Sequence, residues 1–90
     1  MRHEETNREG ASALALGALA WVLSDGARAR RLLDLTGLGP DDLRDRVADR
    51  DLQAEILGFL EAHEPDLLSC AEELGVPPER LVSARAELER

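Results

Sequence analysis

The sequence contains no lysine and no tyrosine, and its 90 residues include one cysteine, one tryptophan and one phenylalanine. The single cysteine, Cys70, excludes an internal disulfide framework and a cysteine-rich zinc site. Valine, isoleucine and threonine are scarce, and because β-branched and aromatic side chains favour strands, we do not expect a β-sheet. Leucine, alanine, glutamate and arginine dominate instead, and all four are good helix formers. The composition therefore predicts an all-α protein.

Basic residues are also fewer than acidic residues. The chain has 19 acidic residues against 11 basic ones, all of them arginine, and a formal net charge of -8. Nucleic acids and anionic membranes both attract basic surfaces, so we expect neither as a partner. The deficit is uneven, because residues 64–90 carry seven acids and three arginines, whereas residues 27–50 carry six arginines and five aspartates.

The longest apolar run, residues 11–23, contains Ser12 as its only polar residue. A bilayer span takes about 20 residues, so this run is too short to cross a membrane. Glu4, Glu5 and Glu9 precede it, whereas a signal peptide requires a basic flank. We therefore predict a cytoplasmic protein in which this run forms a buried helix.

Apolar spacing and helix-end signals divide the chain into five or six short helices. The predicted segments are residues 9–23, 26–36, a short helix from Pro40, and then about 49–62, 64–74 and 77–88. Residues 1–9 are polar and are predicted to be a frayed or disordered tail, while residues 10–90 form a single helical domain. The predicted fold is a compact orthogonal bundle with its first helix at the centre.

The first helix is apolar on two sides. One side carries Leu16, Leu19, Ala20 and Leu23, and the second side carries Leu14, Ala18, Trp21 and Val22. Such a helix is either central in a bundle or covered by a partner. Tryptophan is enriched in interface hot spots, so Trp21 is either a buried helix contact or a partner anchor. The second side is therefore one candidate partner-binding surface.

The arginines of the next two helices form the other candidate site. They are Arg28, Arg30, Arg31, Arg44, Arg46 and Arg50. The spacing predicts i,i+4 ion pairs between Arg30 and Asp34 and between Asp42 and Arg46. The cluster is either a solvated helix surface with internal ion pairs or a patch that binds an acidic protein, RNA or a phosphate ligand.

Residues 70–84 resemble the helix-turn-helix of bacterial DNA-binding regulators. Ala71 occupies the place where the two helices touch, Gly75 the turn, and Val76 and Leu81 the apolar plugs. In that family the second helix enters the major groove. Residues 77–90, however, contain three acids and three arginines, a balance that does not attract a duplex. A transcriptional regulator using residues 67–88 is therefore the alternative function.

Enzymatic chemistry has little support. His63 and Cys70 lie within eight residues of one another, together with Glu64 and Asp66, but Pro65 interrupts the helical register between them. Cys70 falls on a predicted apolar stripe, where a free cysteine is usually inert packing. The chain also lacks a glycine-rich phosphate loop and the HExxH and CxxC motifs. We expect no catalytic residue, metal site, cofactor or small-molecule substrate.

Five parts of the chain resemble a family of small bacterial helical proteins that is catalogued only as a domain of unknown function. They are residues 18–21, 35–44, the corner at Asp49, 57–60 and 70–78, within a resemblance that spans about residues 11–88. The resemblance implies a compact helical cytoplasmic domain, and it implies no catalytic residue, cofactor or substrate. We therefore expect a non-enzymatic protein-interaction module, whose partner is another protein or a second copy of the chain.

Overall fold

The computed structural model describes residues 2–90, with side chains described from Gly10 onward. Within this part of the chain the protein consists of six helices and contains no strand. The helices are α1 (Arg2–Leu23), α2 (Gly26–Thr36), α3 (Pro40–Asp45), α4 (Arg50–Glu61), α5 (Glu64–Leu74) and α6 (Pro78–Leu88). The prediction of an all-α bundle is confirmed.

Helix α1 begins earlier than predicted, at Arg2 rather than at residue 9. Met1 and the side chains of residues 2–9 lie outside the described residues, so the predicted fraying of residues 1–9 stays a prediction. No single helix in the described range is long and apolar enough to cross a membrane, and α1 from Gly10 passes that test only together with α2, at a bend of 119°.

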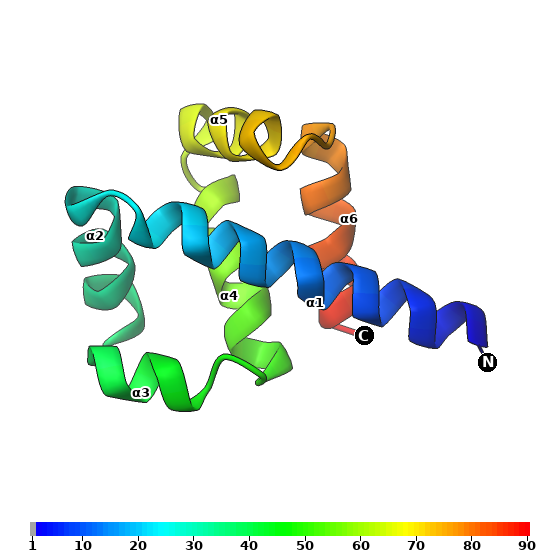
Figure 1. Ribbon diagram of the computed structural model, residues 1–90, viewed down its shortest axis with the longest axis horizontal. Coiled ribbons are helices and arrows are strands. Elements are labelled where there is room, and N and C mark those ends of the chain that lie inside the picture. The colour runs from blue at the N-terminus through cyan, green and yellow to red at the C-terminus, as the bar shows by residue number, and fades with distance from the viewer. Residues whose placement is uncertain (1) are drawn as a thin grey trace.

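Helix α1 crosses the front of the molecule in Figure 1, with α4 behind it, α5 above and α6 to the right. Its most extensive packing is against α6 and then α4, and those two helices also pack against one another. Ala11, Ala15 and Ala18 of α1 are completely buried. Because these side chains are small, neighbouring helices can approach the α1 backbone closely. The first helix is therefore central, as predicted.

The helix ends follow from local sequence. Gly37 and Gly75 adopt left-handed conformations with φ of 72° and 71°, and they end α2 and α5. A residue with a Cβ is disfavoured in this conformation, so glycine is the usual choice after a helix. At the N-terminal ends of α2 and α4, the carboxylates of Asp25 and Asp49 accept hydrogen bonds from backbone N–H groups.

Helix α3 is the least integrated of the six. Every other helix packs closely along at least one neighbour, whereas α3 reaches the core through the buried side chain of Leu43. It has only six residues and starts at Pro40, where the Asp42 carboxylate accepts a hydrogen bond from the Gly39 N–H at 3.2 Å. A short helix held by one anchor leaves the space between α1 and α3 only partly filled.

Candidate functional site

The second apolar side of α1, which was predicted as a partner-binding surface, is largely covered by the protein itself. On the second side, Ala18 and Val22 are completely buried in the protein's own core, so neither offers a surface to a partner. Leu14 and Trp21 on the same side are half-buried and pack against that core. The two sides are similarly apolar in sequence, so hydrophobicity alone does not distinguish them. On the first side Leu19 is buried, whereas Leu16 is 40% and Leu23 45% exposed.

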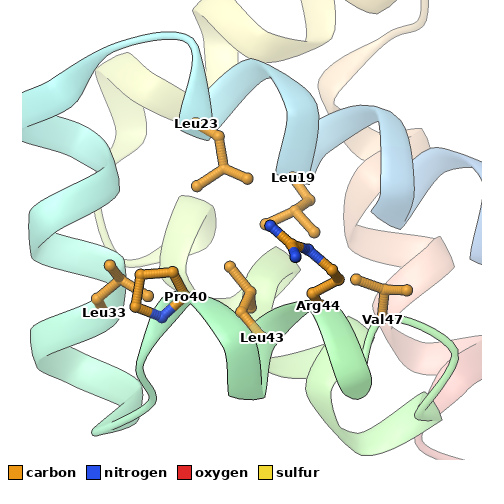
Figure 2. Close-up of a pocket in the computed structure, with 7 residues that line it drawn as sticks. All are labelled: Leu19, Leu23, Leu33, Pro40, Leu43, Arg44 and Val47. Atoms are coloured by element: carbon orange, nitrogen blue, oxygen red, sulfur yellow. The ribbon is translucent and has the colours of Figure 1, made fainter.

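An apolar groove of about 360 Å³ lies between α1, α2 and α3, and we refer to it as the α1–α3 groove (Figure 2). It is lined by Leu19, Leu23, Leu33, Pro40, Leu43, Arg44 and Val47. In Figure 2, Leu43 points from α3 towards Leu19 and Leu23 of α1. A volume of roughly 300–1,000 Å³ and a mainly apolar lining are typical of binding sites in proteins. The groove is therefore the candidate functional site.

The α3 wall of the groove follows from helical spacing. Pro40, Leu43, Arg44 and Val47 stand at i, i+3, i+4 and i+7, so they lie on one face of α3 and the turn that follows. Leu19 and Leu43 are buried and form the floor, while Leu23 and Pro40 are exposed at the rim. Leu16 lies seven residues before Leu23 and therefore on the same face of α1, which extends the apolar surface along that helix.

A buried glutamine holds the Val47 wall in place. Gln53 is 2% exposed, and its Nε2 donates a hydrogen bond to the Val47 carbonyl at 2.7 Å. This bond ties the turn after α3 to helix α4. The sequence analysis missed Gln53, although an uncharged polar residue between Leu52 and Ala54 on a largely apolar helix was an available signal.

Of the seven described residues that line the groove, Arg44 alone is charged. In Figure 2 its side chain extends from α3 towards α1 across the groove opening. The side chain is 80% exposed, and its ion-pair partner is Asp41, whose oxygen lies 3.9 Å away and whose side chain is 95% exposed. Ion pairs between such exposed side chains contribute little stability. The Arg44 guanidinium is therefore accessible to an incoming group.

The predicted arginine cluster does not form a single patch, because most of its members bind the protein itself. The Arg28 guanidinium lies 3.7 Å from the centroid of the Trp21 ring and donates to the Trp21 carbonyl at 3.3 Å. Arg31 pairs with Asp66 at 2.9 Å and so links α2 to α5. These contacts also cover part of Trp21, which was a candidate anchor.

Arg46 and Arg50 are likewise engaged within the protein. Arg46 donates through Nε and Nη2 to the Asp49 carboxylate at 3.2 and 2.9 Å, and this hydrogen bonding lowers the pKa of Asp49. Arg50 donates to the carbonyls of Leu88 and Arg90 at the end of α6. Between residues 10 and 90, the structure forms neither of the two predicted i,i+4 pairs, and Arg30 remains exposed.

The family model for proteins of unknown function DUF3572 matches residues 8–90. The chain belongs to this family. The match confirms the predicted resemblance to a domain of unknown function, and it includes every residue that lines the α1–α3 groove. No curated protein and no solved structure matches the chain.

In this DUF3572 chain the helix-turn-helix corner predicted within residues 67–88 is formed by α5, Gly75 and α6. Leu81, Ala84 and Leu88 of α6 are buried, because α6 packs against both α1 and α4. The exposed residues of α6 include Glu79, Val82, Ser83 and Ala86. Of the two arginines of α6, Arg85 pairs with Glu61 and Glu89, and Arg80 donates a hydrogen bond to the Ser83 hydroxyl at 3.4 Å.

The residues considered for catalysis differ in their exposure to solvent, because Cys70 is buried and His63 is exposed. Cys70 is completely buried, and desolvation raises the pKa of its thiol to about 11, with Arg28 opposing and Asp66 adding to the shift. His63 is exposed and precedes α5 as its N-cap residue. Among the described side chains, no group of three or more histidine, cysteine or acidic residues could hold a metal ion.

Proposed function

We propose that this protein is a non-enzymatic protein-interaction module that holds an apolar helix of a partner protein in the α1–α3 groove. The observation that carries the proposal is the groove itself, a concave apolar site with Leu23 exposed at its rim. Exposed apolar surface that gathers in one concavity is typical of protein-binding sites. The inert environment of Cys70 and the internal use of most arginines also favour binding over chemistry.

The charge of the chain favours a different protein over a second copy. The formal net charge is -8, so two copies repel one another at distances beyond direct contact. A partner helix with net positive charge would instead be attracted and guided to the groove. The proposal therefore commits to a basic partner helix, with self-association as one outcome of the test.

The test is selection of binders from a display library of amphipathic helical peptides, followed by titration of the selected peptides into ¹⁵N-labelled protein. We expect amide shifts to concentrate at Leu19, Leu23, Leu43 and Val47. The variant Leu23→Asp should abolish binding, because it places a charge in the apolar rim. The matched control is Leu68→Asp on α5, since Leu68 is 49% exposed and lies outside the groove lining.

Three outcomes would overturn the proposed function. The first is a library that yields no binder, and the second is a set of binders whose shifts lie away from the groove. The third is a concentration-dependent shift of the groove amides in the protein alone, which would identify a second copy as the occupant.

A second candidate function is DNA binding, which the corner formed by α5, Gly75 and α6 supports. Against it stand the burial of α6 between two helices and the acidic excess of residues 64–90. Titration of labelled random duplex DNA at about 50 mM salt separates the two functions, because electrostatic attraction is then strong. Our proposal predicts no binding, and binding in the micromolar range would favour the regulator.

A further inference from the structure

Arg44 gives the α1–α3 groove a chemical preference beyond its apolar character. We infer that the partner helix carries one aspartate or glutamate beside its apolar anchors, and that this carboxylate pairs with Arg44. The inference rests on the proposed function and names the recognition element of that same site.

The first argument is that, among the side chains that the structure describes, from Gly10 onward, Arg44 has no close ion-pair partner. Arg31 and Arg46 each have a carboxylate oxygen at 2.9 Å, whereas the ion-pair partner of Arg44 lies at 3.9 Å on a fully solvated side chain. Guanidinium groups bind carboxylates through two parallel hydrogen bonds when the geometry permits. Arg44 can therefore accept a new carboxylate without breaking a strong internal pair.

The second argument is the position of Arg44 among the apolar residues. It follows Leu43 directly and precedes Val47 by three residues, so its guanidinium borders an apolar surface on the same face of α3. A bound helix would exclude water from this border, and removal of water strengthens the attraction between opposite charges. Arginine beside an apolar pocket is a frequent arrangement at interface hot spots.

The third argument is the shape of the apolar surface. Leu16, Leu19 and Leu23 recur along α1 at i, i+3 and i+7, which spans about 10 Å or two helical turns. A helix that lies in a groove presents anchors with the same spacing. An acidic residue three or four positions from one anchor then lies on the same side of the partner helix and faces Arg44.

The remaining charge around the site is acidic. Asp41 and Asp45 are exposed on α3, at positions i−3 and i+1 relative to Arg44. Basic residues of the partner on either side of its carboxylate would face these aspartates. The occupant to which the structure points is therefore a basic amphipathic helix with a single acidic residue beside its anchors.

The experiment repeats the peptide selection on the wild-type protein and on Arg44→Glu. Peptides selected by the wild type should carry aspartate or glutamate at one fixed position, one turn from an apolar anchor. Peptides selected by Arg44→Glu should carry lysine or arginine at that position. The matched control, Arg30→Glu, changes an exposed arginine outside the groove lining and should select the same peptides as the wild type.

A double-mutant cycle on one selected peptide measures the pair directly. Replacing the peptide's acid by its amide should weaken binding to the wild type about tenfold, as for a partly desolvated charged hydrogen bond. The same replacement should have almost no effect on binding to Arg44→Gln.

The outcomes separate this inference from the proposed function. Peptides that bind the groove without a fixed acidic position overturn the inference and leave the proposed function standing. An equal loss of affinity for the wild type and Arg44→Gln also overturns it, because the peptide's acid would then contact something other than Arg44. A failure to select any peptide overturns both.

Discussion

Gln53 shows how one polar side chain can shape an apolar site. Its amide hydrogen bond to the Val47 carbonyl holds the turn after α3, and Val47 in turn lines the groove. The bond is partly buried, and a carbonyl that loses its donor away from water costs up to about 1–3 kcal/mol. Gln53 therefore contributes both to stability and to the form of the α1–α3 groove.

Replacing Gln53 by alanine should lower the free energy of unfolding by about 2 kcal/mol, because it removes this hydrogen bond and leaves a cavity. Urea denaturation followed by circular dichroism measures the change. The neighbouring exposed residue provides the control, and Glu55→Ala should change stability by less than about 0.5 kcal/mol. Equal effects for the two variants would show that the bond to Val47 is unimportant.

Because the chain has no lysine and no tyrosine, Cys70 is the side chain whose ionisation should dominate the pH dependence of stability between about pH 9 and 11. The pKa of the Cys70 thiol is about 11 in the folded protein, compared with 9.0 for an ordinary thiol. Well below pH 9 the thiol is protonated in both states and does not affect the dependence of stability on pH. Between about pH 9 and 11 only the unfolded chain loses this proton, so the free energy of unfolding should fall as the pH rises.

Thermal or urea unfolding of the wild type and Cys70→Ala across this range tests the prediction. No lysine or tyrosine titrates in the chain, and arginine stays charged. The stability of Cys70→Ala should therefore be nearly independent of pH from 9 to 11. A decline as steep as that of the wild type would show that Cys70 is not its source.

At the scale of the helices, the corners depend on glycine geometry. Gly75 connects α5 to α6 with φ of 71°, and a Cβ built on it has open space within 4 Å. The constraint at Gly75 is therefore the backbone conformation rather than crowding. Gly26 at the start of α2 also has open space around a Cβ, but its φ is not in the left-handed region.

Gly75→Ala should therefore destabilise the protein by about 1 kcal/mol, because an alanine is strained in the left-handed conformation. Gly26→Ala is the matched control and should be neutral or slightly stabilising, since alanine is favoured in helices. Chemical denaturation of both variants measures the difference. A stability of Gly75→Ala equal to that of Gly26→Ala would contradict the conformational explanation.

At the scale of the whole molecule, the excess of acid opposes the compact state. Nineteen acidic and eleven basic residues share one small domain, and the exposed ion pairs offset only part of the repulsion. Added salt screens the longer-range repulsion more than it weakens the short pairs, such as Arg31 with Asp66.

Raising sodium chloride from about 10 mM to about 150 mM shortens the Debye length from about 30 Å to about 8 Å. The melting temperature at pH 7 should therefore rise by a few degrees, which differential scanning calorimetry can measure. Near pH 4, where many carboxyl groups are protonated, the same addition should have a smaller effect. A fall at pH 7 would show that attractive ion pairs dominate.

The sequence by itself determined the helices, most of their ends and the family, whereas the start of α1 was placed too late. Their signals lie within a few residues of one another, as in the left-handed glycines, the prolines of the first turns and the aspartate caps. The all-α class followed from composition, because the chain contains few residues that favour strands. The central place of the first helix followed from its two apolar sides.

Only the tertiary structure decided which surface of that helix remains open and what the arginines bind. Both sides of α1 are apolar, so hydrophobicity alone could not choose between them, and the face that the other helices cover runs through Ala11, Ala15 and Ala18. Arg31 and Arg50 find their partners 35 and 38 residues away, beyond the reach of local spacing. The α1–α3 groove exists because a short helix with one buried anchor stands apart from α1, and that separation depends on how all the helices pack.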